Sequence, residues 1–320
     1  MQNIATIHDI AFVAELHEVD CDGRPFRRAV KLGDTVRIHR GAYMSAALWR
    51  NLEPRERYRH QVIAAAGASK THPVLSHRSA AVVWGLPLIG TLPQLVDVLS
   101  SKKAGTSKDS SFHRHATRFL HSEIEFVDGV SITSLRRTVI DLALMVPFSA
   151  AVAAVDWALS PGTGSNPKPS LSPEELFETV DALRPSGGAR RAHRAIEFGD
   201  GRSGSAGESI SRAVIHELKL PAPVLQKRFE DRLGVIGCTD FWWPDFGLMG
   251  EFDGAVKYLR EGVPNGRSIT DTVLAEKKRE ERLRALGPSM VRWLWPHALD
   301  PKSLLGLLRA AGLPAPRWGR

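Results

Sequence analysis

The segments TDFWWPD (residues 239–245) and GEFDG (residues 250–254) decide the expected fold of the C-terminal third of this chain. Both consist largely of residues that favour strands, and the Pro-Asp pair that ends the first segment indicates a turn between them. Because successive side chains of a strand point to opposite faces, Glu251 and Asp253 share one face of the second strand. If the two strands pair, Asp240 meets these carboxylates at one end of a sheet.

Three carboxylates at one place point to a bound cation. Like charges that are buried together raise the free energy of the fold unless a cation neutralises them. A dense set of oxygen ligands suits a hard divalent ion. We therefore predict a Mg2+ site at Asp240, Glu251 and Asp253. The alternative interpretation is that these residues are solvated acids at strand ends and bind no metal.

The elements around these segments have a recognisable order. Glu208 begins a helix, residues 224–229 form a strand, a basic helix follows around residues 276–282, and residues 290–294 form a last strand. This order, with an acid on the first helix, an Asp on the second strand and Glu-x-Asp on the third, resembles the PD-(D/E)XK nuclease superfamily, and within it the very-short-patch-repair-type endonucleases. The resemblance covers roughly residues 208–308. It implies an αβββαβ restriction-endonuclease-like core and a Mg2+-dependent endodeoxyribonuclease.

The same resemblance assigns the catalytic residues, which are Glu208, Asp240, Glu251, Asp253 and Lys257. The third motif position is usually a lysine and is Asp253 here, so Lys257, or Lys277 or Lys278 of the basic helix, would supply the missing charge. Gln226, on the first strand, is either a hydrogen-bonding group behind the metal ligands or a surface glutamine. If no lysine reaches the carboxylates, the domain is a degenerate nuclease that only binds DNA.

The composition favours a partner that carries phosphate. The chain has 320 residues, with 43 Lys and Arg against 35 Asp and Glu, and this net charge of +8 suits nucleic acid or an anionic surface. Its most apolar stretch, residues 139–159, is interrupted by acids and a proline, so it is predicted to be a buried pair of helices and no membrane partner is expected. Two distant cysteines and no signal-like N-terminus indicate a reducing, cytoplasmic location.

A second DNA-binding element is expected near the N-terminus. Residues 3–19 have apolar side chains at near-helical spacing, residues 25–32 form a short basic helix, and residues 35–44 alternate as a hairpin that bends at a glycine. A basic helix followed by a hairpin is the layout of a winged helix. The expected DNA contacts are Arg24, Arg27, Arg28 and Lys31 on the helix and Arg37, His39 and Arg40 on the wing. The alternative is a small subdomain with a solvated basic face.

The middle of the chain carries a second family resemblance. The motifs RGAY (residues 40–43), LSHRSAA (residues 75–81), WGLP (residues 84–87) and the helix start at residues 133–142 resemble, in their order, actinobacterial AbiEi-like antitoxins of type IV toxin–antitoxin systems. The resemblance implies a winged helix that binds promoter DNA, an α/β antitoxin-type domain and a cognate toxin as partner. Residues 100–115, which are polar and basic, are expected to form a loop.

Together these observations predict an α/β (α+β) chain of four parts. They are a winged-helix-like domain at residues 1–50, an antitoxin-like α/β domain at 51–160, a linker with helices at 161–206 and an endonuclease-like domain at 207–320. Two functions follow. One is a Mg2+-dependent nuclease that acts on double-stranded DNA. The other is a non-enzymatic antitoxin or transcriptional regulator that binds promoter DNA through the same N-terminal helix.

Overall fold

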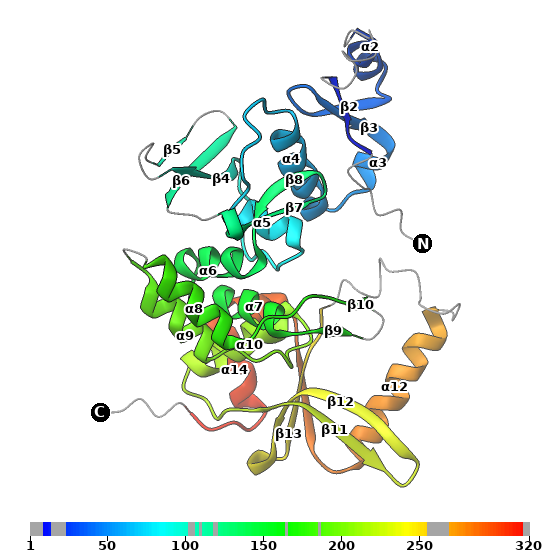
Figure 1. Cartoon of the computed structure of the whole chain (residues 1–320). Coiled ribbons are helices and arrows are strands. Elements are labelled where there is room, and N and C mark those ends of the chain that lie inside the picture. The colour runs from blue at the N-terminus through cyan, green and yellow to red at the C-terminus, as the bar shows by residue number, and fades with distance from the viewer. Residues whose placement is uncertain are drawn as a thin grey trace. The chain divides into compact units, whose positions relative to one another are not determined.

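A computed structural model describes most of the chain as a mixed α/β protein with several small sheets (Figure 1). The described residues are 9–13, 24–101, 106–108, 111–117, 121–163, 166–184, 187–254 and 269–315. The chain divides into two compact units that exchange segments: one contains Pro147–Leu171 and Arg194–Arg320, and the other contains Gln2–Val146 and Ser172–His193. Among the described residues, no helix combines the length and the apolar character needed to cross a membrane.

The first unit along the chain begins with a small antiparallel sheet and three helices. The sheet has the order β1-β3-β2, and the ring of Phe26, on α2, stacks on Tyr43 of β3 at 5.2 Å between centroids. The elements are β1 (Ala11–Phe12), α2 (Arg24–Leu32), β2 (Thr35–His39), β3 (Ala42–Ser45), α3 (Ala46–Asn51) and α4 (Pro54–Gly67).

The prediction of a helix over residues 3–19 is wrong for residues 9–13, the part that the structure describes. Ala11 pairs with Tyr43 and Phe12 with Ala42, so this segment is the edge strand β1. Ile10 and Phe12 are buried on either side of the half-buried Ala11, which is the alternation of a strand. Backbone pairing with a distant strand has therefore overridden a local apolar spacing that resembled a helix.

The second sheet of this unit contains a parallel strand pair, β4 and β6, with β5 antiparallel on the other side of β6, and a separate β7–β8 hairpin. The segment from Phe112 was predicted to be loop, and that prediction is wrong because β6 pairs with β4 over its whole length. The elements are α5 (His77–Trp84), β4 (Val96–Ser101), β5 (Ser107–Lys108), β6 (Phe112–Thr117), η3 (His121–Glu123), β7 (Ile124–Val127), β8 (Val130–Thr133), α6 (Leu135–Met145) and α8 (Pro173–Leu183).

The other unit is built on a four-stranded sheet in the order β11-β12-β13-β14. The first three strands are antiparallel, and β14 runs parallel to β13 after a helical crossover through α12. The predicted order of helix, three strands, helix and strand is found. The elements are α7 (Phe148–Leu159), β9 (Gly162–Thr163), β10 (Asn166–Pro167), α9 (Ala189–Glu197), α10 (Ala206–Glu217), β11 (Val224–Asp231), β12 (Gly234–Trp243), η4 (Pro244–Phe246), β13 (Leu248–Phe252), α12 (Ile269–Ala285), β14 (Ser289–Trp293), α13 (Trp295–Leu299) and α14 (Pro301–Ala310).

The helix pair predicted at residues 139–159 is confirmed as α6 and α7, of which α7 packs in this second unit against α10. Asp156 of α7 accepts two hydrogen bonds of 2.8 Å from Arg212 of α10. Both side chains are almost fully buried. A buried carboxylate needs such a charge-matched donor, so this pair fixes α7 on α10.

The core between α10 and the sheet is aromatic. Phe241, Trp243 and Trp293 cluster with ring centroids 5.0 and 6.1 Å apart, and the Trp293 Nε1–H donates to Ser211 Oγ on α10 at 2.8 Å. Trp242 points to the other face and meets Phe229 edge-on, in the apolar cluster that includes Leu283 of α12. The sheet is thus packed on both faces, by α10 on one and α12 on the other.

Gly207 tests this packing directly. A Cβ atom at this position of α10 would lie 2.0 Å from a ring carbon of Phe252. Gly207→Ala should therefore force the ring or the helix to move and lower the free energy of unfolding by about 1–3 kcal/mol. Gly306→Ala on α14, where an added Cβ would meet no atom within 4 Å beyond its own helix backbone and chain neighbours, is the matched control and should stabilise by up to about 1 kcal/mol. Equal thermal unfolding of Gly207→Ala and wild type would contradict the packing described.

Candidate functional site

Three carboxylates from three elements meet at the end of the second unit's sheet where β12 and β13 pair. Glu208 lies in the first turn of α10, Asp240 on β12 and Glu251 on β13. Glu208 and Glu251 are each only 8% exposed. Phe241 pairs with Gly250, so the next residues outward on the two strands are Asp240 and Glu251. The site brings together three of the acids that the sequence singled out.

Gln226 of β11 connects two of these carboxylates. Its side-chain Nε2 donates to Glu208 Oε2 at 2.9 Å and to Asp240 Oδ1 at 3.1 Å. The backbone of Gln226 has φ +49°, a left-handed conformation that is costly for a residue with a side chain. The residues on either side of Gln226 pair with β12, Leu225 with Phe241 and Lys227 with Thr239. The strained backbone thus accompanies a side chain aimed at the carboxylates, not at solvent.

Glu208 is held in place by the loop that precedes α10. Its two oxygens accept hydrogen bonds of 2.8 Å from the Gly204 N–H and the Ser205 hydroxyl. Ser205 also caps α10 through the Glu208 N–H. Burial, and next the nearby charge of Asp240, raise the pKa of Glu208 to about 7. Near neutral pH this carboxyl group can therefore both hold and release a proton.

The side chain of Asp240, on β12, forms a hydrogen bond to the backbone of β13. Its Oδ2 accepts a hydrogen bond of 2.9 Å from the Phe252 backbone N–H. The carboxylate thereby bonds the backbone of the residue that follows Glu251. Asp240 is fixed relative to β13 by one oxygen and to β11 by the other, through Gln226.

Glu251 is neutralised by two arginines. Arg279 of α12 donates to Glu251 Oε1 at 2.9 Å, and Arg292 of β14 lies 2.7 Å from Oε2. Arg279 also donates to the Cys238 carbonyl at 3.2 Å, and Arg292 to Glu276 at 2.6 Å. Burial raises the pKa of Glu251, while the two guanidinium groups act in the opposite direction.

The other predicted catalytic residues lie apart from this arrangement or outside the described residues. Asp253 follows the end of β13, and its N–H donates to the Trp293 carbonyl at 2.8 Å. Lys257 lies outside the described residues. Lys277 and Lys278 are exposed on α12, and the cation of that helix that reaches Glu251 is Arg279, one residue further on. A Mg2+ ion on Asp240 and Glu251 would fit the oxygen chemistry of the site, but only if Arg279 gave up an oxygen of Glu251.

A second cluster with metal-binding chemistry was missed in the sequence. Asp97, His113 and His115, in the other unit, place one ligand atom each within 4.8 Å of one another, and this group could hold a metal ion. In the described residues, the three predicted metal ligands Asp240, Glu251 and Asp253 do not gather this closely. The two histidines fall in the segment that was predicted to be loop. Only its pairing with β4 shows that they share a face with Asp97.

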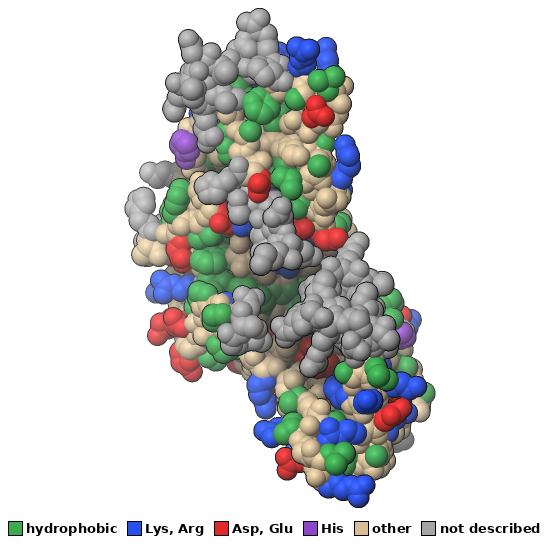
Figure 2. All heavy atoms as spheres, turned by 90° about the vertical axis from the view of Figure 1, so that its right-hand side faces the viewer, with side chains coloured by type: hydrophobic (Ala, Val, Ile, Leu, Met, Phe, Trp, Pro, Cys, Tyr) green, Lys and Arg blue, Asp and Glu red, His purple; other side chains and the backbone are tan. Residues whose placement is uncertain are grey.

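The predicted DNA-contacting residues lie on α2, on β2 and in the turn after β2. Arg27, Arg28, Lys31, Arg37 and Arg40 are exposed, while the side chain of Arg24 lies outside the described residues. His39 is half-buried, and burial lowers its pKa. Figure 2 shows Lys and Arg side chains at the height of α2 in Figure 1.

Basic side chains also gather on the second unit, at the height of the β11–β12 hairpin and α12 (Figure 2). Lys227, Arg228, Arg232, Lys277 and Lys278 are exposed there. They are carried by β11, by α12 and by the turn between β11 and β12. β11 belongs to the same sheet as β12 and β13, which carry Asp240 and Glu251, and α12 packs on that sheet, so the basic residues and the acidic site belong to the same unit.

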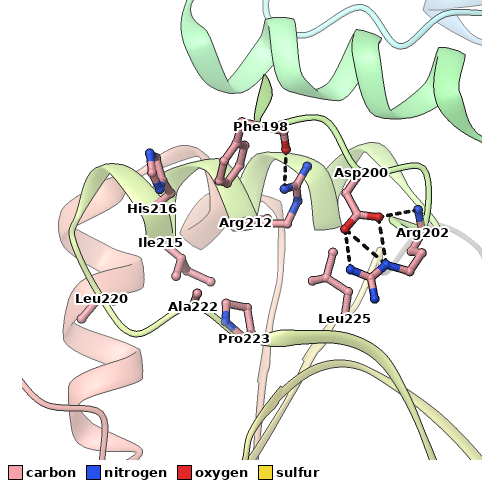
Figure 3. Close-up of a pocket in the computed structure, with 10 residues that line it drawn as sticks. All are labelled: Phe198, Asp200, Arg202, Arg212, Ile215, His216, Leu220, Ala222, Pro223 and Leu225. Atoms are coloured by element: carbon pink, nitrogen blue, oxygen red, sulfur yellow. Dashed lines mark hydrogen bonds and ion pairs between the residues drawn. The ribbon is translucent and has the colours of Figure 1, made fainter. Parts of the chain in front are cut away.

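A cavity of about 140 Å³ lies beside α10 (Figure 3). Its polar wall carries Arg212, which donates to the Phe198 carbonyl, and Asp200, which is paired with Arg202 at 2.7 Å. The rest of the lining is mainly apolar and includes Ile215 and Leu225. The lining of this cavity contains one carboxylate, Asp200, whereas three carboxylates from three elements meet in the cluster, so the cluster is the stronger candidate site.

Comparison with known proteins adds a relationship but no activity. No family model matches the chain. Two uncharacterized proteins from strains of Mycobacterium tuberculosis are each 29% identical to it over 170 residues. The match covers 53% of this chain and 57% of each relative, so the chain spans little more than half the length of the curated relatives it matches.

The raised pKa of Glu208 can be measured by NMR titration of 13C-labelled glutamate side chains. We expect a midpoint of about 7 for one carboxyl group, and a lower midpoint in Asp240→Asn, which removes a neighbouring negative charge. Because ionisation of Glu208 adds a negative charge beside the proposed Mg2+ ligands, Mg2+ affinity should rise as the pH increases through 7. A Glu208 midpoint at the ordinary value for a glutamate would show that its environment is not the one described.

Proposed function

We propose that this chain is a DNA-binding protein whose second unit is a restriction-endonuclease-like domain that hydrolyses DNA phosphodiester bonds with Mg2+. The observation that carries the proposal is the meeting of Glu208, Asp240 and Glu251, from α10, β12 and β13, at one end of a sheet. The strand order and directions of that sheet, with β14 parallel to β13, support the same assignment. Exposed cations on β11 and α12 provide a surface suited to a phosphate backbone.

Each residue of the site has a distinct role in this proposal. Asp240 and Glu251 would hold the Mg2+ ion, which would supply activation of water and stabilisation of the negative charge that develops on the phosphate. Glu208, which lies beside Asp240, would accept a proton from the attacking water or return one. Arg279, once it leaves Glu251, neutralises the scissile phosphate in the place of the usual motif lysine.

The alternative function is a non-enzymatic antitoxin or transcriptional regulator, and one observation favours it. Glu251 already has a guanidinium group on each of its oxygens, from Arg279 and Arg292. A carboxylate neutralised in this way has no electrostatic need of a metal ion. In this alternative the nuclease-like unit is degenerate. The exposed cations of α2 and β2 bind promoter DNA as a winged helix would, and a cognate toxin is the protein partner.

A cleavage assay with the full-length protein separates the two functions. We expect wild type to cut double-stranded DNA with Mg2+ or Mn2+, and Asp240→Asn to lower the rate by at least about 100-fold because a metal ligand is lost. Asp245→Asn, at an exposed acid just beyond the end of β12, is the matched control and should cut like wild type.

If folded wild-type protein cuts no DNA, the result would favour the regulator. In that case promoter binding should weaken steeply with salt, and Arg27→Ala with Arg28→Ala should reduce the slope of log affinity against log salt by about 2. Retained cutting in Asp240→Asn would reject the proposed site.

A further inference from the structure

The first unit contains a group of side chains whose donor chemistry differs from that of the carboxylate site. Asp97 on β4 and His113 on β6 are direct partners in the parallel strand pair, and His115 lies two residues further along β6. Side chains two apart in a strand share a face. The register therefore places all three on one side of the sheet.

Both imidazoles point a nitrogen at the same carboxylate oxygen. His113 Nδ1 lies 3.2 Å and His115 Nε2 lies 2.7 Å from Asp97 Oδ1. Asp97 is 4% exposed, while the side chains of His113 and His115 are 24% and 16% exposed. The carboxylate is thus buried beside two imidazoles that are partly exposed.

Neighbouring residues contact the ring of His115 and the backbone of Asp97. The ring of His77, from the first turn of α5, stacks on His115 with centroids 3.7 Å apart and an angle of 19° between the planes. The Asp97 backbone N–H donates to Ser79 Oγ at 2.8 Å, and that hydroxyl contacts the buried Tyr58 hydroxyl at 3.0 Å. The backbone of Asp97 and the ring of His115 are thus both anchored in the first unit.

We propose that Asp97, His113 and His115 bind one divalent transition-metal ion, with Zn2+ as the best match. Two imidazole nitrogens and one carboxylate oxygen are a ligand set for zinc or iron, and they leave a coordination position open for water or a substrate. Tetrahedral ligands at about 2.1 Å from the ion lie about 3.4 Å from one another. The 3.2 Å contact is close to that spacing, and the 2.7 Å contact must open by only about 0.7 Å.

This site and the carboxylate site select different ions. The ligands around Asp240 are oxygens and amides, which suit Mg2+, whereas imidazole nitrogen favours the softer zinc ion. The zinc proposal therefore does not depend on the nuclease proposal.

Calorimetric titration of the chelator-treated, untagged full-length protein with Zn2+ tests the proposal. We expect one tightly bound equivalent, with affinity lowered more than about tenfold in Asp97→Asn and in His115→Gln, because each removes a ligand. His193→Gln, at a partly exposed histidine of α9 that contacts Asp181, is the matched control and should keep the affinity of wild type. Asp240→Asn should also keep the tightly bound Zn2+ ion, because Asp240 is not a ligand of this site. If the zinc were instead held by the carboxylates of the other unit, this variant would lose it.

No tight equivalent in wild type, or unchanged affinity in both ligand variants, would overturn the proposal. If the variants do not fold, wild-type protein decides the question by histidine NMR. Zn2+ should then shift the ring signals of two histidines in contact with each other, as His113 and His115 are at 4.0 Å between centroids. Ring signals that stay unchanged on addition of Zn2+ would equally reject the site.

Discussion

The meeting of two buried carboxylates, Glu208 and Glu251, with the half-buried Asp240 is the constraint on which the second unit depends. Without compensation, two or three negative charges in a region of low dielectric would destabilise the fold by several kcal/mol. The structure compensates them with an amide from Gln226, backbone and hydroxyl donors around Glu208, and the guanidinium groups of Arg279 and Arg292. The strained backbone at Gln226 is consistent with this requirement, because a strain of this kind persists only where the surroundings demand it.

The same compensation explains why two functions stay open to this site. Two arginines on Glu251 serve equally well as a structural neutralisation or as cations that a metal ion displaces and redirects to a phosphate. The choice depends on whether the free energy gained by Mg2+ binding exceeds the free energy lost when the ion pair between Arg279 and Glu251 breaks. The three carboxylates are linked to α10, α12 and all four strands of the sheet, so either outcome involves most of the unit.

Part of this site could be predicted from the sequence because its cause is local. The alternation of residues 239–245 and 250–254 and the turn between them place Asp240 beside Glu251. Arg279 and Arg292 could not be predicted, because their reach depends on how α12 crosses the sheet. The histidine cluster was hidden for a similar reason. FHRHAT (residues 112–117) is too polar to be recognised as a strand, and its register with β4 comes from tertiary structure. The strand at Ala11 likewise depends on a partner 32 residues away, at Tyr43.

The most direct test of the central claim is a crystal structure of the full-length protein with Mn2+, in which the ion is located by its anomalous signal. We predict an ion bonded to oxygens of Asp240 and Glu251, close to Glu208, with the Arg279 guanidinium displaced from Glu251. A structure in saturating Mn2+ with no anomalous peak at these residues, and with both arginines still paired to Glu251, would contradict the account and leave the carboxylates as a purely structural cluster.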